Sequence, residues 1–303
     1  MKAWIPHPEG LELMGPTPGE VRVEVFSGVG EPPSDPADVE FWAPPFLATS
    51  EATEALTGMS GLKVVQLLSA GAEVWAGKIP DGVTLCDGQG VHSSSTSEWA
   101  MTAILSHVRS FPRFLRAQAE RRWDYAPTDE LAGKRVLIVG AGDIGEALAA
   151  RLAPFEVEVT RVARRARPGV HAVGELPELL PHADVVVLIV PLTDATRGMV
   201  DAEFLSRMAD GALLVNAARG PVVDTSALAA AVAEGRIGAA LDVTDPEPLP
   251  TDHPLWTLPN VLLTPHVAGS VRGLLPRAYR LVGEQLRRHV DGEPLRNVVS
   301  EGY

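Results

Sequence analysis

The chain has 303 residues, which at roughly 150 residues per domain predicts about two domains. Hydrophobic residues make up 46% of it, enough to bury a sizeable core, so a disordered or fibrous protein is excluded. Its 26 Lys and Arg against 39 Asp and Glu give a formal net charge of −13, which repels nucleic-acid phosphates and anionic membrane surfaces.

Cysteine content and the first residues bear on the compartment. Cys86 is the single cysteine of the sequence, which excludes an intrachain disulfide, a cysteine-based zinc site and a CxxC redox pair. Pro6 and Pro8 interrupt the first apolar run, and no stretch reaches the ~18 uninterrupted apolar residues of a membrane span. The sequence therefore predicts a cytoplasmic protein without a bound metal, whose partners are neither nucleic acid nor membrane.

The first ninety or so residues are rich in Pro and Gly and predict a small α/β unit. Its expected strands are the short apolar runs at Val21–Phe26, Leu62–Leu68 and Val83–Cys86. A capping box formed by Ser95 and Glu98 then predicts the start of a helix at Ser95. Apolar residues continue at helical spacing as far as Pro112, which should kink or divide this long linking helix.

From Lys134 onward, apolar runs alternate with helical segments. Runs without polar alternation are typical of strands that are buried on both faces of a parallel sheet. The expected strands are Val136–Val139, Val157–Val162, Ala183–Val190, Ala212–Val215, Ile237–Val243 and Val261–Leu263, and the expected helices include Ile144–Leu152, Ser226–Glu234 and, at the end, about Val271–Val290.

A glycine motif follows the first of these strands directly, as Gly140-Ala141-Gly142-Asp143-Ile144-Gly145. Gly140 permits a tight turn, Gly142 lets the backbone approach a pyrophosphate, and Gly145 allows close packing of the next helix on the strand. We expect a nucleotide here, the alternative being a strand–helix turn without a ligand. The Asp143 carboxylate must then point away from the pyrophosphate or toward an amide.

The residue that selects between NAD and NADP should stand at the end of the next strand, where a carboxylate would hold the ribose hydroxyls of NAD. Ala163 occupies this position, and a basic cluster surrounds it, Arg161, Arg164, Arg165 and Arg167. Arg164 and Arg165 suit a 2′-phosphate, so we expect NADP(H) to be preferred, with NAD(H) also open. A solvated surface turn is the alternative interpretation of the cluster.

Three later strands each lead into a loop with one notable ionisable residue, Arg219, Glu247 and His266. Ligands of open α/β sheets bind beyond the carboxyl ends of the strands, so the three side chains should converge beside the nucleotide. If the nucleotide delivers a hydride to a carbonyl compound, the site needs a cation for any carboxylate group and a proton for the developing alkoxide. The planar fork of Arg219 fits the first task, and His266 fits the second because histidine titrates near neutral pH. Glu247 would orient the imidazole and stabilise its charged form.

Together with the glycine motif, these segments resemble the D-isomer-specific 2-hydroxyacid dehydrogenase family, which includes glyoxylate/hydroxypyruvate reductases. The resemblance implies an α/β protein with two Rossmann-like domains, in which a doubly wound parallel-sheet cofactor domain is inserted into a smaller flavodoxin-like substrate domain. We assign residues 1–94 plus 272–303 to the substrate domain and 95–271 to the NAD(P)-binding domain. The family also implies a homodimer, with a helical arm at about Ser97–Trp123.

The resemblance implies further site residues. The Ser69-Ala70-Gly71 loop would hold the substrate carboxylate through backbone amides, and Asp242 would contact the nicotinamide carboxamide. Other cofactor contacts would come from Thr96, Ile144, Pro191, Ala217 and Ala218. The aromatic segment Phe41–Leu47, with Trp99 and Trp256, would either line the substrate pocket or belong to the core.

The reaction implied is hydride transfer between NADP(H) and a small 2-oxo acid or D-2-hydroxy acid, with glyoxylate and hydroxypyruvate as the default substrates and a larger apolar 2-oxo acid next. Formate dehydrogenases carry Gln where this chain has Glu247, so that subgroup is disfavoured. Two alternatives stay open: a phosphite- or phosphonate-type anion dehydrogenase on the same fold, and a nucleotide-sensing relative without enzymatic activity.

Overall fold

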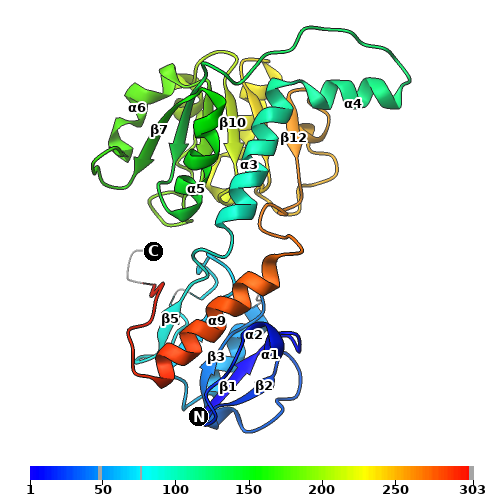
Figure 1. Ribbon diagram of the computed structural model, residues 1–303. Helices are drawn as coiled ribbons and strands as arrows, with labels where there is room; N and C mark the ends of the chain where they lie inside the picture. Colours follow the sequence, from blue (N-terminus) through cyan, green and yellow to red (C-terminus); the bar gives the residue numbers. More distant parts are fainter. Residues whose placement is uncertain (47–49, 76, 300–303) are drawn as a thin grey trace. The chain divides into compact units, whose positions relative to one another are not determined.

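The computed structural model describes residues 1–46, 50–75 and 77–299 and divides the chain into two compact units. Unit 1 is built from the segments before Ser93 and after Ser270, and unit 2 is the continuous segment Ser93–Ser270. Each unit has a parallel sheet with helices packed on it, which confirms the predicted α/β class (Figure 1). Residues 300–303 of the predicted substrate domain and Leu47 of the aromatic segment lie outside the described residues.

Unit 1 contains a five-stranded sheet in the order β2-β1-β3-β4-β5, all pairs parallel. This is the doubly wound order 2-1-3-4-5 of flavodoxin-like sheets. Its elements are β1 (Lys2–Ile5), α1 (Gly10–Leu13), β2 (Arg22–Val25), β3 (Val39–Trp42), α2 (Ser50–Glu54), β4 (Val64–Gln66), β5 (Thr84–Cys86) and α9 (Leu274–Val290).

The helix α9 supplies much of the apolar core of unit 1. It lies across one face of the sheet (Figure 1), where Tyr279, Val282 and Leu286 are buried against Ala3 and Ile5. Gly10 lies so close to the Tyr279 ring that a Cβ atom there would be 2.2 Å from it. The first sheet therefore depends on a helix that lies far away in the sequence.

Unit 2 contains a seven-stranded parallel sheet in the order β12-β11-β10-β9-β6-β7-β8. When β6 is numbered as strand 1 and the order is written from β8, the sheet has the order 3-2-1-4-5-6-7, which is the Rossmann order 3-2-1-4-5-6 with one further strand. The order reverses between β6 and β9, and this is the switch point of the sheet. Its elements are α3 (Ser93–Val108), α4 (Phe111–Ala119), β6 (Arg135–Val139), α5 (Asp143–Leu152), β7 (Glu158–Ala163), β8 (His171–Ala172), α6 (Leu176–Leu179), β9 (Val185–Leu188), α7 (Ala202–Arg207), β10 (Leu213–Asn216), α8 (Thr225–Ala233), β11 (Gly238–Leu241) and β12 (Val261–Leu263).

The central strands of unit 2 explain the long apolar runs of the sequence. Every residue of β9, β10 and β11 is buried, because one apolar cluster covers one face of the sheet and a second, which includes α3 and α5, covers the other. A strand buried on both faces has no need for polar alternation.

The predicted start of the linking helix is wrong by two residues. The helix α3 begins at Ser93, so Ser95 lies inside its first turn and is buried. The Ser93 hydroxyl donates a 2.5 Å hydrogen bond to Asp143 at the start of α5, and this tertiary contact fixes the first turn earlier than the local motif predicted. The division before Pro112 is confirmed: α3 ends at Val108, and Ser110, at φ +55°, turns the chain into α4.

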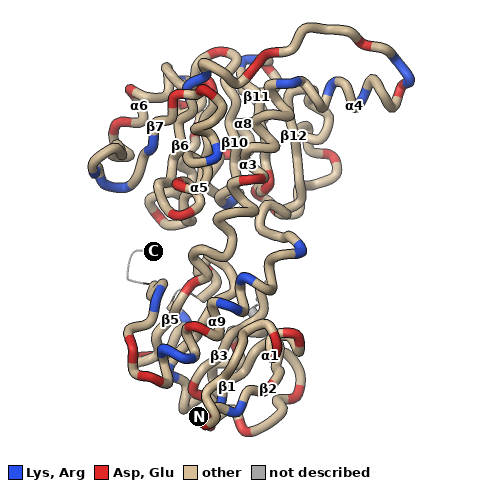
Figure 2. The backbone as a smooth tube through the Cα atoms, in the orientation of Figure 1, with Lys and Arg blue, Asp and Glu red and all other residues tan. Residues whose placement is uncertain are grey.

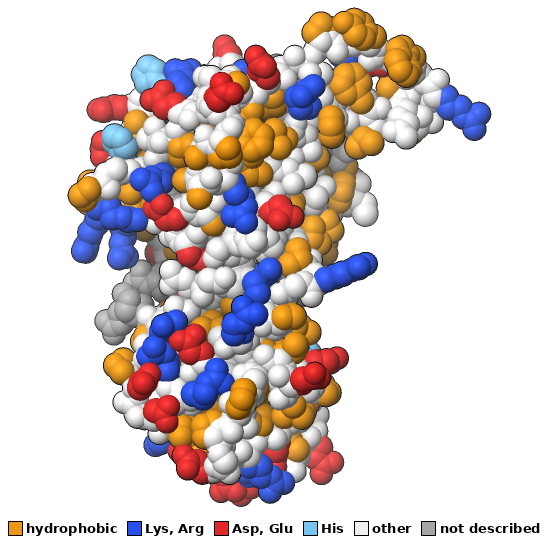
Figure 3. Space-filling model, in the orientation of Figure 1, with side chains coloured by type: hydrophobic (Ala, Val, Ile, Leu, Met, Phe, Trp, Pro, Cys, Tyr) orange, Lys and Arg blue, Asp and Glu red, His pale blue; other side chains and the backbone are white. Residues whose placement is uncertain are grey.

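The segment 111–125, which we call the arm, carries exposed apolar side chains (Figure 3). Trp123 is 95% exposed, and Phe111, Leu115 and Tyr125 are more than half exposed. Asp124 ties the arm together, because Arg113 donates to it at 2.8 and 3.0 Å and Arg122 lies 3.0 Å away. The hydrogen bonds from these two arginines lower the pKa of Asp124 to about 2.

The described residues contain neither a membrane-spanning helix nor a cluster of potential metal ligands. Among them, no helix combines the length and the apolar character that crossing a bilayer requires. Likewise, within the described ranges no three or more His, Cys, Asp or Glu side chains gather as a candidate metal site.

Candidate active site

The glycine loop lies at the switch point of the unit 2 sheet, between β6 and α5. Gly140 has φ +119°, and a Cβ atom there would lie 1.9 Å from the carbonyl oxygen of Ile189, at the end of β9. A Cβ atom at Gly145 would lie 2.0 Å from the carbonyl oxygen of Gly140. A Cβ atom at Gly142 would meet nothing within 4 Å. The first and third glycines are thus required by packing, whereas the second borders open space.

The amino end of α5 is suited to an anion. Gly142 is the N-cap residue of this ten-residue helix, and no side chain caps its first amides. Both carboxylates of the first turn are engaged elsewhere: Asp143 accepts the hydrogen bond from Ser93, and Glu146 pairs with Arg161 at 2.5 Å. Unbonded helix amides attract anions. The Asp143 carboxylate thus accepts a hydrogen bond from the Ser93 hydroxyl.

The open space at Gly142 tests whether the residues fit a dinucleotide. The uncapped amides of α5 and the absence of a side chain at Gly142 leave a place where a pyrophosphate can approach the backbone. The residues present fit the phosphate part of NAD(P). Ile144 is half-buried in the first turn, beside these amides in the sequence.

The basic segment 161–167 follows β7, the neighbour of β6, and Lys and Arg gather there in Figure 2. Two of its arginines are fixed: Arg161 pairs with Glu146 and donates to the carbonyl of Gly169 at 3.2 Å, and Arg167 donates to the carbonyl of Ala141 in the glycine loop at 2.6 Å. Arg164 and Arg165 are exposed between them. The segment is therefore tied to the first turn of α5 on one side of these two side chains and to the glycine loop on the other.

The loop after β10 presents Arg219. Asn216, which is buried, closes this loop by accepting from the amide of Ala218 at 3.0 Å and donating to the carbonyl of Arg219 at 3.1 Å. The half-buried Arg219 side chain donates to the carbonyl of Ala218 at 2.7 Å. Ala217 donates its amide to Leu188 of β9 at 3.2 Å, so this loop starts beside the switch point.

The loops after β10 and β11 are in direct contact. A Cβ atom at Gly220 would lie 1.9 Å from the carbonyl oxygen of Thr244, and the Thr225 hydroxyl donates to the carbonyl of Asp245 at 2.7 Å. Gly220 directly follows Arg219, and Glu247 lies three residues beyond Thr244. The structure thus brings the loop that carries Arg219 against the loop that carries Glu247.

Glu247 and His266 form a hydrogen-bonded pair. The imidazole Nδ1 of His266 lies 2.7 Å from Oε1 of Glu247, and both side chains are exposed enough to meet a ligand. His266 follows β12 and has φ +54°, in the left-handed region that few residues other than glycine adopt. Because Nδ1 faces the carboxylate, Nε2 is the imidazole atom left to face a substrate.

Asp242 lies beneath this pair at the end of β11 and is 3% exposed. Its carboxylate accepts from the Thr264 hydroxyl at 2.6 Å and from the amides of Val267 and Ala268 at 2.9 and 2.8 Å. The resemblance implied a nicotinamide contact for this residue. In the structure, both oxygens already hold the loop around His266.

The other predicted cofactor residues are dispersed around the switch point. Thr96 is buried in α3, and Ala218 is buried in the loop before Arg219. Pro191, which is exposed after β9, accepts from the Thr196 hydroxyl at 2.6 Å. No described contact joins these residues to one another.

The predicted substrate loop belongs to unit 1, after β4. Ser69, Ala70 and Gly71 are half-buried, the Ser69 hydroxyl donates to the carbonyl of Gly71 at 3.0 Å, and Gly88 donates to the carbonyl of Ser69 at 2.7 Å. Phe41 and Trp42, in the nearby aromatic segment, are fully buried in apolar clusters. They are core residues.

Two side chains at the site have a role that sequence patterns did not reveal. The indole Nε1 of Trp99 donates to the Thr264 hydroxyl at 3.0 Å, although the residues lie 165 positions apart. The only local signal was the place of Thr264, two residues before His266. Trp256, by contrast, is 53% exposed and donates to the carbonyl of Pro250 at 2.8 Å.

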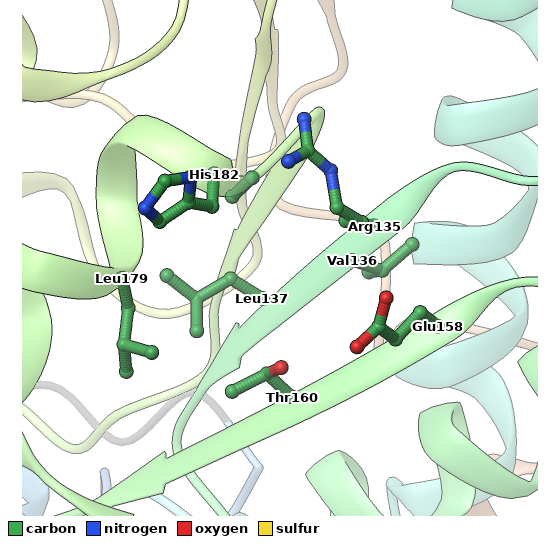
Figure 4. Close-up of a pocket in the computed structure, with 8 residues that line it drawn as sticks. Arg135, Val136, Leu137, Glu158, Thr160, Leu179 and His182 are labelled. Carbon is green, nitrogen blue, oxygen red and sulfur yellow. The ribbon is translucent and has the colours of Figure 1, made fainter.

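A separate cavity of about 180 Å³ lies in unit 2, on the face of β6 and β7 (Figure 4). Leu137, Leu179, Thr160 and His182 are among its lining residues, and the sticks of Leu137 and Leu179 point toward each other. None of the predicted site residues lines it.

Comparisons with known proteins point to one family. Residues 101–268 match the model of the D-isomer specific 2-hydroxyacid dehydrogenase NAD-binding domain. The chain is 35% identical to a glyoxylate reductase of Thermofilum pendens over 79% of this chain and 75% of that protein. A D-isomer specific 2-hydroxyacid dehydrogenase of Xanthobacter autotrophicus Py2, solved with NADPH and MES, is 33% identical with a TM-score of 0.85, covering 99% of this chain and 97% of that one. An NADPH-dependent glyoxylate/hydroxypyruvate reductase of Sinorhizobium meliloti, solved with NADP and sulfate, is 26% identical with a TM-score of 0.81, at 99% and 97% coverage.

Proposed function

The chain belongs to the D-isomer specific 2-hydroxyacid dehydrogenase family of NAD(P)-dependent oxidoreductases, and we propose that it reduces a small 2-oxo acid, glyoxylate or hydroxypyruvate, with NADPH. The observation that carries the proposal is the 2.7 Å pair of His266 and Glu247, in which Glu247 lies on a loop packed against the one that bears Arg219. A carboxylate-oriented imidazole beside a guanidinium is the set of groups that reduction of a 2-oxo acid requires.

Each of the three side chains has a separate task. Arg219 binds the substrate carboxylate and carbonyl oxygens through its planar fork, which orients the carbonyl carbon. His266 holds a proton on Nε2 and donates it to the developing alkoxide. Glu247 accepts a hydrogen bond from Nδ1 and so fixes the ring orientation, which leaves Nε2 to face the substrate.

The cofactor would be held by the glycine loop, the first amides of α5 and the basic segment. When bound, it supplies or accepts the hydride. Ala217, Ala218, Pro191 and Thr96 are proposed to line the remainder of its site, and the Ser69-Ala70-Gly71 loop is proposed to bind the substrate carboxylate. In this assignment unit 1 is the substrate domain and unit 2 the cofactor domain.

We propose a preference for NADPH over NADH that rests on Arg164 and Arg165. Ala163 offers no carboxylate for the ribose hydroxyls, and Arg161 and Arg167 are occupied by Glu146 and Ala141. Arg164 and Arg165 directly follow Ala163, are exposed, and are the candidates for the 2′-phosphate. The similar enzymes named with NADPH or NADP support this choice.

A substrate panel tests the function directly. Purified protein is assayed with glyoxylate, hydroxypyruvate and phenylpyruvate, each with NADPH and NADH, by the nicotinamide absorbance. We expect the highest kcat/KM with glyoxylate or hydroxypyruvate and NADPH. NADPH binding without turnover of any 2-oxo acid contradicts the proposal and favours the nucleotide-sensing alternative, and NADP⁺ reduction by phosphite favours the anion dehydrogenase.

Cofactor preference has its own test. One charge-assisted contact to the 2′-phosphate corresponds to about a tenfold to hundredfold preference in kcat/KM. The combined replacement of Ala163 by Asp and of Arg164 and Arg165 by Gln should reverse it, whereas Arg207→Gln, at an exposed arginine of α7, should not. If the ratio of kcat/KM with NADPH to kcat/KM with NADH changes less than twofold, the basic segment 161–167 is a solvated turn.

We further propose that the chain forms a homodimer in which the arm is covered by a second copy. The support is the exposed apolar surface of the arm, since contiguous exposed apolar patches mark interaction sites. Sedimentation at micromolar concentration should give about twice the chain mass of 32.2 kDa. A species near the mass of one chain contradicts the dimer.

A further inference from the structure

A row of hydrogen bonds connects the helix α3 to the loop that bears His266. It runs from the Trp99 indole Nε1 to the Thr264 hydroxyl at 3.0 Å, and from there to the Asp242 carboxylate at 2.6 Å. Trp99 is half-buried on α3, packed against an apolar cluster of unit 2, and Asp242 is buried at the end of β11. Three separate elements thus meet in one row.

The direction of the row follows from the groups themselves. An indole N–H can only donate, and an ionised carboxylate can only accept. The Thr264 hydroxyl must therefore accept from Trp99 and donate to Asp242. A hydroxyl that accepts one hydrogen bond becomes a stronger donor in the next, so Trp99 strengthens the contact on the carboxylate.

The carboxylate in turn holds the loop around His266. Its two oxygens accept the amides of Val267 and Ala268, and the backbone carbonyl of Asp242 accepts the amide of His266 at 2.7 Å. His266 lies between these anchors at φ +54°, a conformation that a histidine backbone keeps only when its surroundings impose it. Its distance to Glu247 depends on that conformation, because χ rotations alone cannot compensate for a shifted backbone.

We propose that Trp99 and Thr264 are positioning residues, which hold the His266 loop in its strained conformation through Asp242 and so keep the imidazole aligned with Glu247. The inference rests on the proposed function, in which His266 donates the proton. Neither Trp99 nor Thr264 is proposed to touch the substrate or the cofactor. Both act on kcat through the placement of His266.

The test uses substitutions that remove one hydrogen bond and keep the shape. Trp99→Phe removes the N–H, Thr264→Val removes the hydroxyl, and Thr264→Ser restores it without the methyl group. The matched control is Trp4→Phe, which removes an indole hydrogen bond to the Glu24 carboxylate in unit 1. Melting temperature and NADPH fluorescence titration accompany steady-state kinetics with glyoxylate for every variant.

We expect Trp99→Phe to lower kcat about three- to tenfold and Thr264→Val about ten- to a hundredfold, because the second bond is made to a charged group. The Kd for NADPH should stay within twofold in both. Thr264→Ser should recover most of the wild-type kcat, and Trp4→Phe should leave it unchanged. In Thr264→Val protein, adding Trp99→Phe should change kcat less than twofold, since the row is already broken.

Several results would overturn the inference. Independent, multiplying effects of Trp99→Phe and Thr264→Val on kcat mean that the two residues do not act through one row. An unchanged kcat in Thr264→Val, or a loss that Thr264→Ser does not recover, contradicts positioning as well. A wild-type protein without 2-oxo acid reductase activity contradicts the proposed function instead. In that case the row is judged by histidine NMR, in which Thr264→Val should shift the His266 ring signals and Trp4→Phe should not.

Discussion

Substitution of Gly142 and of Gly145 in the glycine loop should separate cofactor binding from folding. In Gly142→Ala, the added methyl group meets no protein atom within 4 Å, and the residue keeps an ordinary backbone conformation. Alanine is less favourable than glycine at an N-cap by about 1 kcal/mol or less, and the stiffer unfolded chain offsets this by about 0.4–1 kcal/mol. We therefore expect the melting temperature to change by less than about 4 °C.

The same methyl group lies where the pyrophosphate must approach the backbone. Loss of one amide contact to a charged phosphate costs about 1.5–3 kcal/mol, which weakens NADPH and NADH binding alike by about ten- to a hundredfold. Gly145→Ala should instead destabilise the fold and lower the melting temperature. Its Cβ atom would lie 2.0 Å from the carbonyl oxygen of Gly140, and overpacking against backbone costs about 1–3 kcal/mol or ~2–12 °C in melting temperature.

Differential scanning fluorimetry and NADPH fluorescence titration measure the two effects on the same samples. Gly174→Ala, at a glycine whose Cβ atom also meets nothing within 4 Å, serves as the control for both. A Gly142→Ala protein that binds both cofactors as tightly as the wild type refutes the assignment of the loop. A Gly145→Ala protein as stable as the wild type refutes the packing argument.

Three further predictions concern single side chains. His266→Gln should lower kcat for glyoxylate reduction by ~10²–10⁴-fold without weakening NADPH binding, and a loss below tenfold removes His266 from the role of proton donor. Arg219→Lys should raise KM and lower kcat together in steady-state kinetics, because a point charge cannot reproduce the planar fork, and a nearly silent substitution makes Arg219 a surface charge. Burial lowers the pKa of His107, so the unfolded chain takes up the proton more readily than the folded one, and stability falls as the pH drops below the usual histidine value of ~6.5. Between about pH 8 and 5.5 the melting temperature of His107→Gln should fall less than that of the wild type, and equal falls contradict the argument.

Six of the seven strands of unit 2, all but the two-residue β8, were readily predicted, because their signal is local. Apolar runs such as Val136–Val139 stand out wherever a strand is buried on both faces, and the glycine loop follows one of them directly. In unit 1, β1 and β3 were missed. Lys2–Ile5 and Val39–Trp42 are only four residues long and lie next to Pro-rich segments, so periodicity is too short to detect there.

The side-chain partners at the site were beyond sequence reasoning. Arg161, Arg164, Arg165 and Arg167 read as one basic cluster, yet the fold assigns Arg161 to Glu146 and Arg167 to the glycine loop. The partners of Arg161 and Arg167 depend on the approach of α5 and of the loop after β6, which is a tertiary property. The same holds for Trp99, whose partner lies 165 residues away in the chain.

The place of α9 in the sequence has a consequence for synthesis on the ribosome. The strands of unit 1 leave the exit tunnel first, but the helix whose Tyr279, Val282 and Leu286 cover their apolar face is translated only after the whole of residues 93–270. Unit 2 is continuous and can fold while it emerges, whereas the face formed by Ala3 and Ile5 must wait, exposed to solvent and to other nascent chains. We therefore expect this protein to depend most on chaperones in the period before α9 is synthesised. Expression at a high level should trap chains in which the sheet of unit 1 is still incomplete.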